Sequence, residues 1–439
     1  GDVYKRQAYN EADRRAARGN PDDLEKMKMD MNLMKQYAEF AVKIGVNPQP
    51  GQTLIIRAPI EGAFFARACA EAAYAAGAKE VVVHYSDEKL SRIKMEHTAV
   101  EVLEDVKPWL QRSYLDYVES EGGACMLSIS ARDPEIYKGL DMEKIDRANQ
   151  AAMKAQEEWR SYTMSDKVQW SIVAIPSAAW AGKVFPGAAE DEAQEMLWDA
   201  IFDVCRVKNG NVVSEWQAHV KKMTAWRDRM NALDLDSIRL QSANGTDLTI
   251  GLADGHVWEG AQSRTPEGYT FIANIPTEEV FTAPHRLRVN GVVKGTKPYV
   301  YNGNLIEGFS VTFKDGEVVE HSAQSGEALL GQLLDTDEGS RRIGEIALVP
   351  ASSPINRRGI LFYNTLFDEN AACHIAFGKG YPGTVKGGTA MTKQELLAHG
   401  VNDSIIHEDV MVGAPDMTIT GTTRTGENVK IFENGEWAF

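Results

Sequence analysis

The spacing of apolar residues predicts alternating helices and buried strands in the first half of the chain. Apolar side chains recur at helical spacing between residues 34 and 41, and the uninterrupted apolar run of residues 53–56 is typical of a buried strand. The alanine-rich segment 62–76 predicts a second helix, which is followed by another strand at residues 81–85. A helix that joins two buried strands within about 35 residues indicates a parallel pair.

Two further apolar runs, residues 124–129 and 170–175, lie between helical stretches and extend the predicted parallel sheet. A helical zone over residues 190–228 then closes this half. We therefore expect an α/β domain over residues 31–232. The preceding residues 1–30 are polar and rich in Arg, Asp and Glu, and we expect them to be a leader outside the fold, either a native extension or an artefact.

The second half has a different sequence pattern, which predicts short strands separated by glycine-containing turns. Asn-Gly and Asp-Gly pairs between alternating strands are the strongest local signals for hairpins. They occur at Asn244-Gly245, Asp315-Gly316 and Asn434-Gly435. Helices are expected at residues 326–334 and 370–377. The pattern predicts a two-domain protein whose second unit, residues 233–439, is an α+β domain with antiparallel strands.

The composition sets limits on size, partners and compartment. A chain of 439 residues exceeds the size at which one hydrophobic core keeps growing, so two domains are expected. The net charge of −16 opposes binding to nucleic acid or to an anionic membrane and favours cations and neutral or cationic substrates, although acidity also simply keeps proteins soluble. No apolar run is long enough to span a bilayer. The four cysteines are widely spaced in apolar contexts, which indicates reduced thiols in a cytoplasmic protein.

Histidine is scarce, with nine residues in the chain, so the setting of each one is informative. His407 and Asp409 lie in residues 404–413, which have the pattern of a strand. Because side chains alternate along a strand, these two point to one face and Glu408 points to the other. Two such groups on a rigid strand can hold one ion with little ordering cost. The alternative is an ordinary half-polar strand face.

A second histidine, His374, lies in the segment that we expect to be a helix, with Asp368 as its N-cap and Gly378 as its end. The small residues around His374 would allow another element to approach closely. A histidine on a small and apolar helix face is also a common core residue, so both interpretations remain open. Glu369, about a turn and a half earlier, either reaches the same ion or favours the helix dipole.

Three carboxylates stand next to apolar runs, where burial without a countercharge is costly. Glu345 heads one such run, and either a cation or the neighbouring Arg341 and Arg342 would have to compensate it. Glu278 and Glu279 precede an apolar aromatic run, and on a strand they would point to opposite faces. Only one of the pair can then be a direct ligand of a given ion, and the other would act as a general base or an outer ligand.

A site rich in carboxylates with a few imidazoles suits two divalent ions that share a water, which is hydrolytic chemistry. A peptidase, an amidase, a phosphoesterase or a non-catalytic metal-binding protein would all fit such ligands. One motif is misleading. Residues 378–383 match G-x-G-x-x-G, but they are expected to follow a helix and Pro382 interrupts them, so dinucleotide binding is not expected.

Four ordered segments together resemble the thermophilic-type metallo-aminopeptidases, the group of aminopeptidase T, aminopeptidase S and PepS. They are residues 274–284, residues 344–350, residues 364–374 and His407-x-Asp409-x-Met411-x-Gly413. The similarity runs from about residue 31 to the C-terminus. The resemblance implies an α/β domain paired with a metal-carrying α+β domain. It also implies a cytoplasmic homodimer that removes N-terminal amino acids from peptides with two divalent ions, which would be zinc, cobalt or manganese.

The resemblance further implies roles for individual residues. The metal ligands of the family fall on Glu279, Glu345, Glu369, His374, His407 and Asp409. The register of the Thr-Glu-Glu-Val motif favours Glu279 over Glu278 as the ligand, which leaves Glu278 to accept a proton from the attacking water. Tyr381, seven residues beyond the histidine of the motif, is associated with catalysis in this family.

Overall fold

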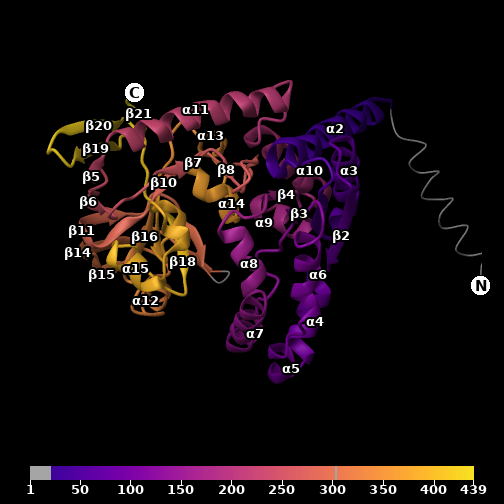
Figure 1. Cartoon of the computed structure of the whole chain (residues 1–439), viewed down its shortest axis with the longest axis horizontal. Helices are drawn as coiled ribbons and strands as arrows, with labels where there is room; N and C mark the ends of the chain where they lie inside the picture. The colour runs from indigo at the N-terminus through magenta and orange to yellow at the C-terminus, as the bar shows by residue number, and fades with distance from the viewer. Residues whose placement is uncertain (1–20, 302–303) are drawn as a thin grey trace, which may run out of the picture.

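The computed structural model describes residues 21–301 and 304–439, and side chains from residue 31 onward with the exception of residue 300. Residues 1–20 of the expected leader lie outside the described residues, whereas the last part of the leader belongs to helix α2 (Pro21–Phe40). Figure 1 shows two halves, and helix α11 (Val212–Ala232) runs across the top from one to the other.

The four predicted strands of the first half form one parallel sheet. In chain order they are β1 (Thr53–Pro59), β2 (Glu80–Ser86), β3 (Ala124–Ser130) and β4 (Trp170–Ala174). Their order in the sheet is β2-β1-β3-β4, and each neighbouring pair is parallel. The predicted α/β architecture is confirmed, including the helix α3 (Ala63–Ala75) between the first two strands.

Helices cover both faces of this sheet, because its strands are apolar on both sides. Leu54 and Ile56 of β1 join the larger core, which contains residues of α2, α3 and α10 (Glu190–Val204). Ile55 points to the other face and joins a smaller cluster with residues of α6 (Trp109–Val118) and α8 (Glu157–Met164). The sheet is therefore held between two helical layers.

The second half consists mainly of two antiparallel sheets. The larger contains β5 (Leu235–Gln241), β6 (Asp247–Leu252), β11 (Pro284–Lys294), β14 (Ser310–Lys314), β15 (Glu317–Ser322), β19 (Thr418–Thr423), β20 (Asn428–Glu433) and β21 (Glu436–Trp437). The smaller has the order β18-β17-β16-β10-β7, with bounds His407–Met411, His374–Gly378, Ile343–Leu348, Val280–Thr282 and Glu259–Gly260. The predicted antiparallel second half is confirmed, as is helix α12 (Glu327–Leu334).

All three predicted hairpins join neighbouring strands of the larger sheet. In the turns at Asp315-Gly316 and Asn434-Gly435, both central residues have positive φ, between 51° and 81°. This is the backbone of a type I′ turn, whose twist matches that of the flanking strands. Aspartate, asparagine and glycine tolerate this conformation, so these residue types fix where each hairpin turns.

The two sheets of the second half enclose an apolar core. Ile346, Ile375 and Val410 lie on the three adjacent strands of the smaller sheet, and all three point into this core. Glu345 and Asp409 immediately precede two of these residues, so they point to the opposite face of the sheet. The apolar face thus fixes which polar groups emerge on the other side.

The expected helix at residues 370–377 is wrong. The chain forms a short helix α14 (Thr365–Asp368) and a single 3-10 turn (Glu369–Ala371), then enters strand β17 at His374. The segment is short, small and apolar, and such runs fit a buried strand as well as a helix. Pairing with β16 on one side and β18 on the other decides the outcome, because this buried segment then has backbone partners on both sides.

The two halves share a core. Residues from beyond the expected boundary at 232/233 pack into the core of the first half, among them Ile275, Phe362 and Phe367. The Trp180 indole of the first half donates a hydrogen bond to the carbonyl of Phe362. In Figure 1, helices α13 (Pro354–Arg358) and α14 accordingly lie between the halves.

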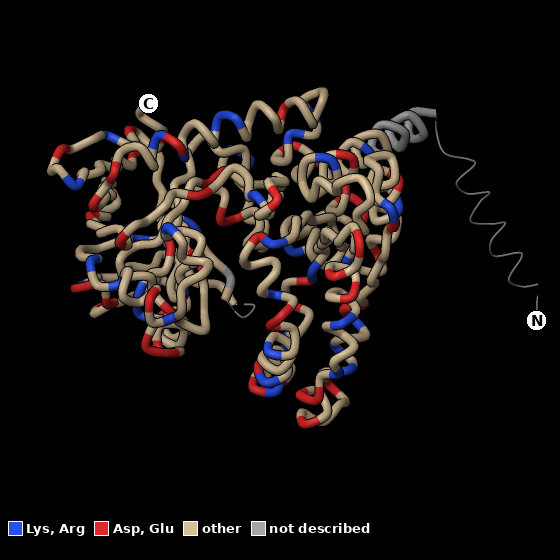
Figure 2. Tube along the Cα trace, in the orientation of Figure 1, with Lys and Arg blue, Asp and Glu red and all other residues tan. Residues whose placement is uncertain are grey.

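Figure 2 shows basic and acidic residues interspersed over both halves. Within the described part of the chain, no helix combines the length and the apolar character needed to cross a bilayer.

Candidate metal centre

The candidate site lies on the face of the smaller sheet that points away from the apolar core. Glu345 on β16 lies opposite Ala376 on β17, which in turn lies opposite Asp409 on β18. His374 precedes Ala376 by two residues and therefore shares its face. Because Ala376 is small, it leaves open the space between the two carboxylates that flank it. Three residues distant in the sequence are thus placed side by side by strand register.

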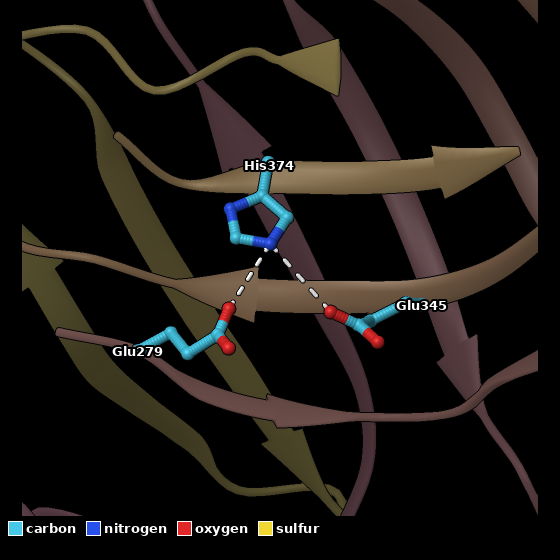
Figure 3. A group of neighbouring side chains, drawn as sticks. All are labelled: Glu279, Glu345 and His374. Atoms are coloured by element: carbon cyan, nitrogen blue, oxygen red, sulfur yellow. Dashed lines mark ion pairs between the residues drawn. The ribbon is translucent and has the colours of Figure 1, made fainter. Parts of the chain in front are cut away.

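His374 is the centre of the first ligand group. Its Nε2 lies 3.1 Å from Oε2 of Glu279 and 3.5 Å from Oε1 of Glu345, as Figure 3 shows. The same nitrogen is 4.0 Å from Oδ1 of Asp409. Glu279 comes from the loop directly before β10, so a fourth segment reaches this face of the sheet. His374 is buried, and the alternative of an unpartnered core histidine is excluded.

A second ligand group forms around His407. Its Nε2 lies 3.5 Å from Oδ1 of Asp409 and 3.8 Å from Oε2 of Glu345. Each group could hold a metal ion, because its ligand atoms lie within 4.8 Å of one another. Glu345 belongs to both groups and offers one oxygen to each histidine.

Backbone carbonyls orient both imidazoles. Nδ1 of His374 lies 3.2 Å from the carbonyl of Ala372, and Nδ1 of His407 lies 2.7 Å from the carbonyl of Lys379. A carbonyl can only accept, so each Nδ1 carries the hydrogen in these contacts. In the neutral ring, Nε2 then presents a lone pair to the carboxylates, which is the orientation that a metal ligand requires.

The residues fit a divalent cation. Oε2 of Glu279 and Oδ1 of Asp409 are buried, and neither forms a hydrogen bond of normal geometry, although the Nε2 atoms of His374 and His407 lie 3.1 Å and 3.5 Å from them. Carboxylates and imidazoles are the usual ligands of zinc, cobalt and manganese. A cation would satisfy the two orphaned oxygens and offset the charge of the cluster.

The charges of the cluster perturb the pKa values of its members. Burial raises the pKa of Glu345, and burial together with the charges of Glu279 and Asp409 raises the pKa of Glu369 well above its ordinary value. Burial alone would lower the pKa of His407, but Asp409 and Glu345 outweigh it and raise that pKa to about 10. The metal-free cluster therefore retains protons that a bound cation would have to displace.

Glu369 and Tyr381 lie beside the two ligand groups. Glu369, in the 3-10 turn before β17, is close enough to Glu279 and Asp409 to interact with their charges. The ring of Tyr381 lies 4.7 Å from that of His407, and the residue as a whole is 36% exposed. Burial of the hydroxyl and the charges of Glu345 and Asp409 raise the pKa of Tyr381 well above its ordinary value, so it keeps its proton. The structure thus brings five of the six expected ligands together in the two groups and places Glu369 and Tyr381 near them.

Glu278 points away from Glu279, as expected for adjacent residues in an extended segment. Its carboxylate is 2.5 Å from Nη1 of Arg206 and 3.7 Å from Nε2 of His219. Both partners belong to the first half of the chain. The backbone N–H of Glu278 donates to Oδ1 of Asn370, the neighbour of Glu369, at 2.8 Å.

The structure also shows the partners of Arg341 and Arg342 and the orientation of Glu408. Arg341 and Arg342 form ion pairs with Asp335 and Glu317, so neither arginine compensates Glu345. Glu408 points to the other face of β18, as expected, and burial raises its pKa to about 7.

The G-x-G-x-x-G motif of residues 378–383 follows strand β17. The expectation that it follows a helix is therefore wrong. After Gly378 the chain forms only a three-residue 3-10 turn (Pro382–Thr384), and the neighbouring strands are antiparallel. A dinucleotide site of this type requires a parallel strand–helix–strand unit. The motif therefore does not form one.

The comparison with known proteins agrees with this geometry. The family model of the thermophilic metalloproteases (M29) matches residues 30–437. The chain belongs to the thermophilic metalloprotease (M29) family. Relatives of this M29 chain include aminopeptidase 2 of Geobacillus stearothermophilus, which is 45% identical over 92% of this chain and 98% of the relative. Aminopeptidase AmpS of Bacillus subtilis is 43% identical over the same shares.

A solved structure extends the similarity to three dimensions. Wild-type AmpT from Thermus thermophilus has a TM-score of 0.86 and 38% identity, covering 93% of this chain and 100% of that chain. The M29 family is one of metallo-aminopeptidases, and its members among the relatives are named aminopeptidases. This M29 chain is therefore a metallo-aminopeptidase with an α/β half and an antiparallel half that carries the candidate metal residues.

Sequence reasoning missed the groups that orient the candidate ligands of this M29 chain and the neighbouring Glu278. The carbonyls of Ala372 and Lys379 belong to the backbone, which carries no residue-specific signal. Arg206 and His219 lie in the helical zone of the first half, about 60 to 70 residues before Glu278, and nothing in their local patterns points to a metal site.

We predict that Glu345→Gln weakens metal binding by at least about 100-fold, because Glu345 belongs to both ligand groups and even outer partners of ligands contribute 10- to 100-fold. Metal titration of the chelator-treated protein measures this. Glu408→Gln is the matched control, since it makes the same change on the opposite face of the same sheet, on β18. Equal losses in the two variants would contradict the assignment of faces.

We also predict that metal binding at pH 7 releases protons. With a pKa of about 10 in the metal-free protein, His407 is protonated at pH 7, whereas a ligand imidazole must be neutral. Apparent affinity should therefore rise with pH, by about tenfold per pH unit for each proton displaced. Calorimetric titration in two buffers of different ionisation enthalpy measures the release. Identical heats in both buffers would show that no proton leaves.

Proposed function

We propose that this aminopeptidase uses two divalent ions, zinc, cobalt or manganese, to hydrolyse the first peptide bond of substrates with a free N-terminus. The observation that carries the proposal is the sharing of Glu345 by two ligand groups on one face of the sheet. Such ions, when bound, lower the pKa of a shared water and polarise the scissile carbonyl.

The proposed ligands divide between two positions. Glu279 and His374 would hold one ion, and His407 and Asp409 the other. Glu345 would bridge them, because its two oxygens face different histidines. Glu369 would complete the set from the 3-10 turn before β17. The apolar packing behind the strands supports this role by keeping the ligand face fixed.

We assign the proton transfers to Glu278. Its carboxylate would take the proton of the attacking water and pass it to the amine that leaves with the shortened peptide. Arg206 supports this assignment, because its guanidinium lies 2.5 Å from the Glu278 carboxylate and holds it in place.

Tyr381 would stabilise the tetrahedral oxyanion formed from the scissile carbonyl. An oxyanion is stabilised by a hydrogen-bond donor placed where the charge develops. Tyr381 retains its hydroxyl proton, lies against His407 and is partly exposed to incoming substrate.

We also propose that the enzyme is a cytoplasmic homodimer. The four cysteines are buried and unpaired, which agrees with reduced thiols in a cytoplasmic protein. A homodimeric state rests on the resemblance to the family.

A chelator tests the central claim. We expect EDTA to abolish hydrolysis of aminoacyl-p-nitroanilides, and cobalt, zinc or manganese to restore it, because the attacking water depends on the ions. A matched pair of peptides with free and acetylated N-termini separates an aminopeptidase from a general amidase. Full activity in EDTA would refute metal dependence, and equal cleavage of both peptides would refute recognition of the free terminus.

The variant Tyr381→Phe should lower kcat by about 100- to 1,000-fold, the range for loss of one donor to an oxyanion. Metal content should stay at the wild-type level, because the phenol is not among the proposed ligands. Steady-state kinetics together with metal analysis of the same sample measure both. A variant with wild-type kcat would remove Tyr381 from the mechanism.

A further inference from the structure

Two residues of the α/β half clamp the loop that carries Glu278 and Glu279. Nε2 of His219 lies 2.9 Å from the carbonyl of Thr277, and since a carbonyl only accepts, this nitrogen donates. Nη1 of Arg206 pairs with the Glu278 carboxylate at 2.5 Å. The loop belongs to the antiparallel half, so both contacts cross between the halves. The segment before β10 is therefore held by the other half of the molecule.

Arg206 is itself held rigidly. It is the second residue after helix α10 and has a φ of 59°, a conformation that non-glycine residues adopt only rarely. Its guanidinium lies 5.4 Å from the ring centroid of Trp216, a fully buried residue of α11. The Trp216 indole donates to the carbonyl of Cys205 at 2.8 Å, which fixes the residue just before Arg206. The guanidinium is thus placed between an aromatic ring and the Glu278 carboxylate.

The ion pair is buried, with side-chain exposures of 15% for Arg206 and 4% for Glu278. Removing one partner of a buried pair leaves the other charge without compensation, and the remaining side chain is then no longer held in place. Such a movement would disable a carboxylate that has to be correctly aimed. Glu279, one residue further on, faces His374 instead, and its Oε2 lies 3.1 Å from Nε2 of that residue.

We propose that Arg206 is a positioning residue: the α/β half uses its guanidinium to aim Glu278 for proton transfer at the metal centre built by the other half. The inference rests on the proposed role of Glu278 as the base. It gives the α/β half a part in the chemical step, although that half supplies none of the proposed ligands. Arg206 acts through Glu278 and does not touch the reacting atoms.

The structure offers a direct way to test a positioning role. Arg206 lines a cavity of about 440 Å³, together with Asp203, Asn209, Pro354, Arg357 and Arg358. A small cation can therefore reach the place that the Arg206 side chain leaves when it is truncated. Free guanidinium at millimolar concentration, far below denaturing levels, is the probe.

The experiment compares Arg206→Ala with Arg358→Ala in the full-length, metal-loaded enzyme. Arg358 is the matched control, because it lines the same cavity and also bridges the halves, through Asp199 and Asp203, but it does not contact Glu278. We expect Arg206→Ala to lower kcat by about 100-fold or more, the size of a general-base contribution, with KM changed less than about threefold. Its metal content should equal that of the wild type, and guanidinium should restore part of kcat. Arg358→Ala should keep kcat within about twofold and gain nothing from guanidinium.

A conservative variant keeps the test decisive if Arg206→Ala folds poorly. Arg206→Lys retains the charge but loses the planar fork, so its kcat should fall between those of the wild type and Arg206→Ala. Loss of bound metal from Arg206→Ala, or equal kcat in Arg206→Ala and Arg358→Ala, would overturn the proposal.

Glu278→Gln in the same assay separates this inference from the proposed function. A strong loss of kcat in Glu278→Gln with a normal kcat in Arg206→Ala refutes only the positioning role. A normal kcat in Glu278→Gln refutes the base itself, and the positioning role falls with it. Wild-type activity that is indifferent to EDTA refutes the metal mechanism as a whole.

Discussion

The site depends on one electrostatic constraint: four carboxylates are gathered on one face of a sheet with only two imidazoles among them. Glu279, Glu345, Glu369 and Asp409 repel one another at these separations, and burial increases the energetic cost because water cannot screen the charges. Protons relieve the repulsion in the metal-free protein, and divalent cations would relieve it on binding. The protein can maintain this arrangement because the other face of the same strands is locked into an apolar core.

The alternation of side chains along the strands links the packing of the core to the placement of the candidate ligands. On β16, β17 and β18, apolar residues point to the core, and the ligands occupy the alternate positions. A shift of one residue in any of these strands would bury a ligand in the core and expose an apolar side chain. The packing energy of Ile346, Ile375 and Val410 therefore also enforces the register that places Glu345 opposite Ala376 and Ala376 opposite Asp409.

The sequence predicted the α/β and antiparallel halves, the hairpins and the strand bearing His407 and Asp409, because each has a local periodicity or turn signal. It failed at His374, where a short run of small apolar residues fits a helix and a strand equally well, and only pairing with two neighbouring strands decides. Local pattern also gave no sign of Arg206 or of the two carbonyls that orient the imidazoles. Their importance comes from tertiary proximity, which no window along the chain contains.

The shared core between the halves has a consequence for the ancestry of the protein. Ile275, Phe362 and Phe367 fill the interior of the α/β half, although the chain reaches them only after crossing into the antiparallel half. A gene fragment that ended after α11 would encode the α/β half without these three side chains, and its apolar core would be incompletely filled. The first half is therefore not a self-contained folding unit, and exchanging it alone would also require replacements for these three core residues.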